Sequence, residues 1–421
     1  MKAIGVITFN FAPYNVTGTF RVLKFVKCMP DYGIQPIVIT ADQGNHHINE
    51  KLMNDVPENC KIYRLKSFFP DAQERYQKKT FLYSNRKKSL VKSFVRIIKD
   101  LFLSPDIQIT WSLYHVLNIS KIIKKEHIKT VLITGAPFSL FICGLLLKKM
   151  NGVKLILDYR DCWQKDLGQM AQSTVRQYLN KVYETLVLKN TDAVIATTQM
   201  ILDLTTDGIR VPYKKVIPTG YDPQDFHKGK HETDRKSSTF TFFYSGKYLP
   251  GDQVYDPFMM INNLNRLSEE YTVKLIVCGH VDESVKKEHC LKYPFIDFKG
   301  FLSRTDLIRI AQESDAFIHF YYPNKLQDTI SFKLFEYSQY NKPIISINTA
   351  DSEVSSFLKS SRIGIFCEND DEEAVRDCFK KVILMDINGF QAGINKNEIE
   401  KYSIKNTSRE LCDFIKLIDK G

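Results

Sequence analysis

The sequence lacks a hydrophobic run of the length that a membrane-crossing helix requires. Its most apolar stretch, residues 131–147, contains Gly135-Ala-Pro137 and falls short of the roughly 20 residues that span a bilayer. The segment Met1–Thr8 is too short and too polar for a signal peptide, and its pattern predicts a strand. We therefore expect a cytoplasmic protein, with at most peripheral contact at the inner face of the membrane.

The sequence also lacks the patterns of disulfide frameworks and of zinc sites. Its nine cysteines are scattered, odd in number, and form no CxxC pair or Cys/His cluster, which favours a reduced intracellular protein. An Asp-x-Asp pair is missing as well, which argues against a Mg²⁺ ion held on a diphosphate by carboxylates. We expect no metal and no cofactor.

Length and charge indicate what is present instead. A chain of 421 residues is too long for one compact core, so two domains are expected. Lys and Arg exceed Asp and Glu by 59 − 48 = 11, which indicates an acidic partner such as a nucleotide diphosphate or an anionic lipid. No recognition motif with interleaved aromatic residues accompanies the basic residues, so we expect no nucleic-acid partner.

Both halves of the sequence open in the same way. A strand is predicted at Ala3–Thr8 and another at 239–244, and each is followed by a loop, a helix and a further strand. This order is typical of a doubly wound parallel sheet. The polar stretch 223–238 predicts a linker. The expected fold class is α/β, with Rossmann-like domains at 1–222 and 239–400 that face a cleft.

Candidate site residues follow the predicted strands of the first half. Ligands of doubly wound sheets bind beyond the carboxyl ends of the strands. Gly18 and Arg21 come after the first strand, Ser139 begins a helix, and Arg160-Asp161 ends a buried strand. Gly18 could also be an ordinary turn residue, and Arg160 and Asp161 could form an ion pair that closes the strand end.

In the second half, Gly246-Lys247 follows the first strand. Such a glycine lets the backbone approach a diphosphate closely, and the lysine ammonium neutralises its charge. Lys247 could alternatively be a solvated loop residue.

Residues 328–343 predict a loop, a short helix and the start of a buried strand. Ser331 is placed as the N-cap, and Asn341 suits a left-handed helix end. Asp328 and Glu336 flank the helix start, where they could face one pocket from two sides.

The same stretch resembles the donor-site motif of retaining GT-B glycosyltransferases of the family 4 type. That motif has two acidic residues separated by seven, often around a Ser-Lys-Leu-x-Glu-Tyr core. Here the first acidic residue is Asp328 and Asn341 replaces the usual glycine. Residues 135–139 and 158–163 resemble the Ser-Pro-Pro-x-Ser loop and the Asp-x-Arg-Asp-x-Trp strand end of that family.

The resemblance implies a nucleotide sugar on the second domain, an acceptor on the first, and a C-terminal helix, 401–421, that crosses back to the first domain. It places the nucleotide base near Gly300 and Phe301. The predicted catalytic residues are Asp161, Lys247, Lys333 and Asp328. The predicted substrate-binding residues are Gly18, Arg21, Arg160, Ser139, Gly246, Gly300, Phe301, Ser331, Phe332 and Glu336.

The function that we expect is a metal-independent retaining glycosyltransferase of surface polysaccharide synthesis. Its donor would be a nucleotide sugar, with UDP preferred, and its acceptor a glycan or a lipid-diphosphate-linked glycan. A catalytically silent nucleotide-sugar-binding subunit and a sugar-nucleotide epimerase on the same fold remain alternatives. Residues 86–101 predict a basic amphipathic helix, which could lie on an anionic membrane or cover its own core with a solvated basic face.

Overall fold

The structure of the protein is a computed structural model. It describes residues 1–44, 48–67, 101–164, 173–226, 238–252, 256–320, 330–348, 352–368 and 371–420. Asp328, residues 86–100 of the predicted basic helix and residues 227–237 of the predicted linker lie outside these ranges. The chain forms two compact units, which we call unit 1 (Met1–Thr219 with Ile404–Gly421) and unit 2 (Gly220–Ser403).

Unit 1 is built on a seven-stranded sheet in which every neighbouring pair of strands is parallel. The strands lie in the order β3-β2-β1-β4-β5-β6-β7. Their bounds are β1 Lys2–Thr8, β2 Ile34–Asp42, β3 Lys61–Lys66, β4 Thr130–Gly135, β5 Lys154–Tyr159, β6 Ala193–Ala196 and β7 Tyr213–Val216. The order reverses between β1 and β4, which are adjacent, so this sheet has its switch point there.

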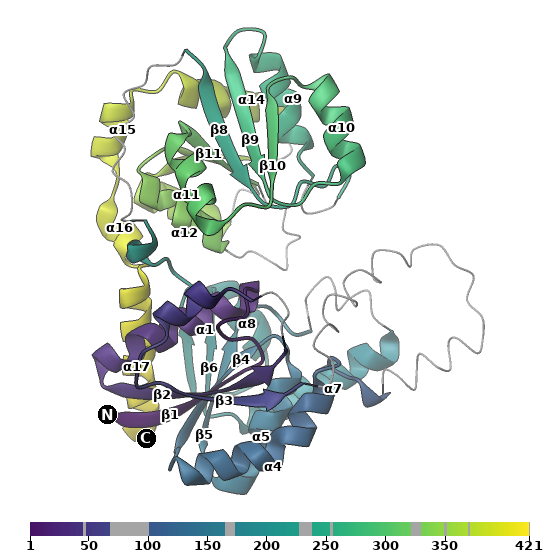
Figure 1. Ribbon diagram of the computed structural model, residues 1–421, viewed down its shortest axis with the longest axis vertical. Coiled ribbons are helices and arrows are strands. Elements are labelled where there is room, and N and C mark those ends of the chain that lie inside the picture. Colours follow the sequence, from purple (N-terminus) through teal and green to yellow (C-terminus); the bar gives the residue numbers. More distant parts are fainter. Residues whose placement is uncertain are drawn as a thin grey trace, which may run out of the picture. The chain divides into compact units, whose positions relative to one another are not determined.

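Helices cover both faces of this sheet (Figure 1). One face packs against α4 (Ile109–Lys125), α5 (Ser139–Asn151), α7 (Thr174–Asn190) and α8 (Gln199–Thr206). The other face packs against α1 (Thr17–Cys28) and α17 (Ile404–Lys420). The central strands are buried on both sides, as their near-continuous apolar sequences predict.

Unit 2 contains a six-stranded parallel sheet in the order β10-β9-β8-β11-β12-β13. The bounds are β8 Phe240–Ser245, β9 Val273–Cys278, β10 Ile296–Gly300, β11 Ala316–Phe320, β12 Ile344–Asn348 and β13 Gly364–Glu368. Here the switch point lies between β8 and β11. The predicted α/β fold with two doubly wound parallel sheets is therefore confirmed.

Two helical layers also enclose the sheet of unit 2. On one face lie α9 (Phe258–Leu267), α10 (Glu283–Lys292) and α14 (Glu372–Ile383). The other face carries α11 (Arg304–Glu313), α12 (Phe332–Tyr337), α13 (Glu353–Ser361), α15 (Ile387–Gly393) and α16 (Lys396–Glu400). Beyond α12, Asn341 has a φ of 53°, the left-handed end that the sequence predicts.

Candidate functional site

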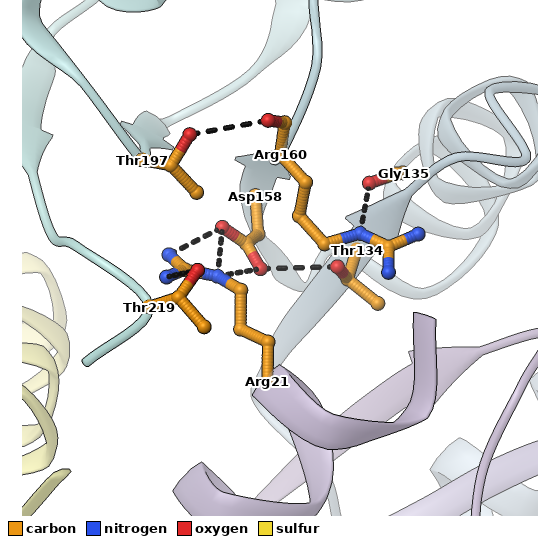
Figure 2. Close-up of polar contacts among 7 residues, drawn as sticks. All are labelled: Arg21, Thr134, Gly135, Asp158, Arg160, Thr197 and Thr219. Atoms are coloured by element: carbon orange, nitrogen blue, oxygen red, sulfur yellow. Dashed lines mark hydrogen bonds and ion pairs between the residues drawn. The ribbon is translucent and has the colours of Figure 1, made fainter. Parts of the chain in front are cut away.

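The switch point of unit 1 is occupied by a buried ion pair between Asp158 and Arg21 (Figure 2). Asp158 lies near the end of β5, and its carboxylate accepts from Arg21 Nη2 at 2.9 Å and from Nε at 3.0 and 3.2 Å. Thr134 pairs with Asp158 across the β4–β5 ladder, and its hydroxyl donates to the same carboxylate at 3.0 Å. These bonds fix α1 to the carboxyl ends of β4 and β5.

Arg21 was predicted to bind substrate, but its side chain is only 2% exposed. Its Nη1 also lies 3.5 Å from the hydroxyl of Thr219. Both ends of the guanidinium are therefore used within unit 1, which favours a role in positioning α1 over direct contact with a substrate.

Arg160 lies beside the first turn of α1. Its Nε donates to the Gly135 carbonyl at 2.6 Å, and its Nη2 donates to the Ala136 carbonyl. Burial lowers the pKa of Arg160, and the neighbouring Asp161 opposes that shift. A Cβ atom on Gly18 would lie 2.8 Å from Arg160 Nη1. The structure thus brings together two predicted site residues, and a larger side chain at position 18 would have to displace the Arg160 guanidinium.

Asp161 and Ser139, the other predicted residues of unit 1, differ in their surroundings. Asp161 is exposed. Ser139 is fully buried and donates through its hydroxyl and its backbone N–H to the carboxylate of Asp106, at 2.6 and 3.0 Å. Burial raises the pKa of Asp106 although these bonds oppose the shift. Asp106 thus accepts from the first residue of α5, whose N-cap position is held by Phe138. Sequence reasoning missed Asp106 because it lies 33 residues before Ser139.

In unit 2, three glycines stand at the carboxyl ends of the adjacent strands β8, β9 and β10. Gly246 N–H donates to the Cys278 carbonyl, and Gly279 N–H donates to the Gly300 carbonyl, both at 2.8 Å. A Cβ atom on Gly279 would lie 2.2 Å from the Gly246 carbonyl oxygen, and the φ of Gly279 is +123°. Three loops therefore lie close together at one edge of the sheet.

Lys333, from the first turn of α12, extends to this glycine edge. A Cβ atom on Gly246 would be 2.8 Å from Lys333 Nζ. Burial lowers the pKa of Lys333 to about 8, with Glu336 opposing the shift and Lys247 reinforcing it. The predicted residues Gly246, Lys247 and Lys333 thus lie in one cationic region, beside backbone that only glycine permits.

Glu336 forms an ion pair with Arg304, with 2.5 Å between Oε1 and Nη2. Arg304 Nη2 also lies 3.4 Å from Asp225. Burial raises the pKa of Glu336 despite the opposing charge of Arg304. Arg304 could not be selected from the sequence, since it begins a separate helix, α11, 32 residues before Glu336.

Ser331 holds the N-cap position of α12, but its side chain makes no cap hydrogen bond. Its hydroxyl instead lies 3.0 Å from His319 Nε2, and His319 Nδ1 lies 3.0 Å from the Ser346 hydroxyl. Burial lowers the pKa of His319 to about 3, and the charge of Lys333 adds to the shift. A neutral imidazole therefore links β11, β12 and the start of α12.

Phe301 follows Gly300, and its side chain is 83% exposed. Phe332 is half-buried at the start of α12. Among the residues that the structure describes, no group of three or more His, Cys, Asp and Glu side chains could hold a metal ion. Chemically, the switch-point edge of unit 2 combines lysine ammonium groups with a carboxylate that a guanidinium orients, which suits a phosphate-bearing ligand with hydroxyl groups.

Comparison with protein families gives a match to Glycosyltransferase Family 4 over residues 20–225. None of the proteins with curated descriptions matches this sequence. The family match lies almost wholly in unit 1 and contains Arg21, Ser139, Arg160 and Asp161.

Solved structures extend the fold comparison to the whole chain. A glycosyltransferase from Rickettsia africae superposes with a TM-score of 0.65 at 15% identity, covering 100% of this chain and 99% of the other. Sucrose-phosphate synthase from Thermosynechococcus elongatus gives a TM-score of 0.66 at 11% identity, covering 100% of both chains. HepE from Anabaena, in complex with UDP and glucose, gives 0.64 at 10% identity, covering 99% of this chain and 100% of the other. At these identities the similarity is one of fold.

Proposed function

Because residues 20–225 match the model of Glycosyltransferase Family 4 and the chain has the GT-B fold, we propose that this protein transfers a sugar from a nucleotide sugar to an acceptor. Unit 2 would bind the donor and unit 1 the acceptor. The proposal is carried by Lys333, whose Nζ lies against Gly246 at the switch point of the unit 2 sheet. In doubly wound folds this is where ligands bind.

The donor that we propose is a UDP-sugar, most simply a UDP-hexose. HepE, which this chain resembles in fold, is known in complex with UDP and glucose. The diphosphate would be met by Lys247 and Lys333, with Gly246 leaving room for the Lys333 ammonium group. Since a nearby negative charge raises the pKa of a lysine, bound diphosphate would keep Lys333 protonated at neutral pH.

Two lysines supply the positive charge that a departing nucleoside diphosphate requires, so we propose that transfer needs no metal ion. Preorganised charges of this kind can each contribute a few kcal/mol to transition-state stabilisation. The Glu336–Arg304 pair would hold hydroxyl groups of the donor, and Asp161 would contact the acceptor. We also propose that the configuration at the anomeric carbon is retained. Retention would result from front-side displacement, in which the leaving phosphate takes the acceptor proton.

The acceptor that we propose is a glycan, either free or linked to a lipid diphosphate at the cytoplasmic face of a membrane, in surface polysaccharide synthesis. Within the described residues, no helix is both long and apolar enough to cross a bilayer.

The test is to incubate the protein with UDP-, GDP- and ADP-sugars, with and without EDTA, and to measure nucleoside diphosphate release and sugar transfer. We expect one nucleotide class to react in EDTA. Lys333→Met should lower kcat/KM by about 100-fold or more, in the range seen when one transition-state donor is removed.

Lys359→Met, at an exposed position of α13, is the matched control and should leave the rate unchanged. Nucleotide binding without release would instead indicate the silent subunit. Conversion of the free nucleotide sugar without an acceptor would indicate the epimerase. Unchanged kcat/KM in Asp161→Ala would remove Asp161 from the site.

A further inference from the structure

The turn that carries Lys247 is held from both faces of the unit 2 sheet by buried tyrosine side chains. We call Ser245, Gly246 and Lys247 the Ser245–Lys247 turn. Tyr244 Oη donates to the Lys247 carbonyl at 2.7 Å, and Tyr337 Oη accepts from the Ser245 N–H at 3.0 Å. Tyr244 belongs to the core on one face of the sheet and Tyr337 to the core on the other. The two ends of the turn are therefore each bonded to a side chain that a packed core fixes.

Each tyrosine ring is stacked on a phenylalanine of β11, the strand beside β8 at the switch point. Tyr244 lies on Phe320 with 4.4 Å between the ring centroids and 14° between the ring planes. Tyr337 lies on Phe317 with 4.7 Å and 15°. Phenylalanine would stack in the same way at both positions, and a buried hydroxyl is costly unless it is hydrogen-bonded. What the two hydroxyl groups add to the packing is therefore their bonds to the Ser245–Lys247 turn.

Tyr244 also lies close to the ammonium group of Lys333. A Cβ atom on Gly246 would be 2.5 Å from Tyr244 Oη and 2.8 Å from Lys333 Nζ. The phenol oxygen and the ammonium nitrogen therefore both lie against the backbone of the turn at one point. The charge of Lys247 lowers the pKa of Lys333, so the two ammonium groups are near enough to repel each other. The conformation of the turn consequently sets the spacing between two like charges.

We propose that Tyr244 and Tyr337 are positioning residues, which hold the Ser245–Lys247 turn so that the ammonium groups of Lys247 and Lys333 stay together for the phosphates of one nucleoside diphosphate. Without this restraint the two like charges would move apart, and bringing them together again would consume part of the binding free energy. The inference rests on the proposed function and concerns the same site. It adds two residues that act on the ligand through Lys247.

The first test compares two tyrosines of unit 2 by calorimetry of UDP binding at neutral pH. Tyr244→Phe removes one hydroxyl and leaves the stack on Phe320, and we expect it to weaken binding about five- to tenfold. Tyr248→Phe is the matched control. It removes another buried hydroxyl, which lies 2.7 Å from His289 Nδ1, and should leave UDP affinity unchanged. Each variant loses one buried hydrogen bond of the same length, so the two should lower the thermal unfolding midpoint by similar amounts.

A double-mutant cycle shows whether Tyr244 acts through Lys247. Lys247→Met alone should weaken UDP binding, and Tyr244→Phe added to Lys247→Met should weaken it no further, because no ammonium group is left to position. Tyr337→Phe should weaken UDP binding as Tyr244→Phe does. It should also lower the thermal unfolding midpoint, since the Ser245 N–H would lose its acceptor. Fully additive losses from Tyr244→Phe and Lys247→Met would contradict the positioning role.

A measurement without any nucleotide separates this inference from the proposed function. The rate at which acetic anhydride modifies Lys333, followed by mass spectrometry across neutral and alkaline pH, reports the pKa of its ammonium group. We expect a midpoint at about 8 in the unchanged protein and in Tyr248→Phe. In Tyr244→Phe the midpoint should be higher, because Lys247 moves away and water enters the space that the hydroxyl leaves.

An unchanged UDP affinity together with an unchanged Lys333 midpoint in Tyr244→Phe would overturn the inference. Equal losses of affinity in Tyr244→Phe and Tyr248→Phe would overturn it too, because the effect would then be one of stability. A raised Lys333 midpoint in Tyr244→Phe, in a protein that binds no UDP, would support the positioning role and count against the proposed function alone.

Discussion

The guanidinium of Arg304 holds the carboxylate of Glu336, with 2.5 Å between Nη2 and Oε1. The two residues differ in exposure, since the Glu336 side chain is 11% exposed and that of Arg304 is 41% exposed. The acid is thus shielded from water while its partner remains partly hydrated. Burial raises the pKa of Glu336 even with Arg304 in place. The ion pair with Arg304 therefore helps to keep the Glu336 carboxyl group charged.

Removal of Arg304 should therefore leave Glu336 without its compensating charge. We expect Arg304→Met to raise the pKa of Glu336 further and to destabilise unit 2 by about 1–2 kcal/mol, below the 3–5 kcal/mol of a fully buried pair because Arg304 is partly hydrated. Glu336→Gln should recover part of this loss when added to Arg304→Met. Denaturant unfolding of the two single variants and the double variant measures the coupling, and strictly additive effects would contradict it.

The lowered pKa of Lys333 predicts two opposite responses to pH. Affinity for UDP should fall as pH rises through about 8, since the ammonium is lost, and Lys333→Arg should remove that step. Stability should change the other way. Between pH 8 and 10.5 the unfolded chain holds the proton that the folded protein has released, so the free energy of unfolding should rise relative to Lys333→Met. Calorimetry of UDP binding across this pH range tests the predicted fall in affinity. Denaturant unfolding over the same range tests the predicted rise in stability, and Lys359→Met is the control for both.

The contact between Gly279 and Gly246 predicts a sharp difference between two glycine substitutions. Gly279→Ala would place a Cβ atom 2.2 Å from the Gly246 carbonyl oxygen and would strain a backbone with φ of +123°. We expect a loss of about 3 kcal/mol or more together with weakened UDP binding. Gly251→Ala has a φ of +77° but open space around it, so it should cost only about 1 kcal/mol. If Gly279→Ala and Gly251→Ala lowered the free energy of unfolding equally, the loops that contain Gly246 and Gly279 would be able to separate.

In unit 1, the Asp158–Arg21 pair predicts a large effect on stability. Both side chains are almost fully buried, so Asp158→Asn should destabilise unit 1 by about 3–5 kcal/mol by leaving a buried guanidinium unpaired. Asp203→Asn, on the exposed surface of α8, should change stability by less than about 0.5 kcal/mol. Thermal unfolding gives the comparison. An Asp158→Asn protein as stable as the control would mean that water or another group satisfies Arg21.

The sequence predicted the fold well because its strongest signals are local. The apolar run Leu155–Leu157 becomes a buried central strand, and so does Ile344–Ile347, which only Ser346 interrupts. Each sheet begins with the strand–helix–strand opening that was predicted for its half of the sequence. Gly18, Arg160 and Gly246 were predicted at the carboxyl edges, and the structure places each of them there. Lys333 was predicted on the helix that follows the motif loop, and its side chain extends to the same edge.

The partners of the site residues could not be predicted, because each depends on a contact between distant segments. Asp158 and Arg21 are separated by 137 residues, and a buried aspartate at a strand end could equally have faced a substrate. Ser331 follows the pattern of a helix cap, yet its hydroxyl bonds to His319, because β11 brings the imidazole to the same place. Local capping preference is worth only about 1 kcal/mol, so one tertiary hydrogen bond can replace it.

The two ends of unit 2 are tied together, since Tyr221 N–H donates to the Tyr402 carbonyl at 2.9 Å and Tyr221 bridges Ser403. Residues 220–403 are consequently one continuous stretch of chain inserted into the sequence of unit 1. A single uninterrupted gene fragment therefore encodes the whole of unit 2. Unit 1 is divided instead, because Leu411, Ile415 and Ile418 of α17 are fully buried in its core. A truncation after residue 403 would open that core, whereas a fusion of residue 219 to residue 404 would keep it intact.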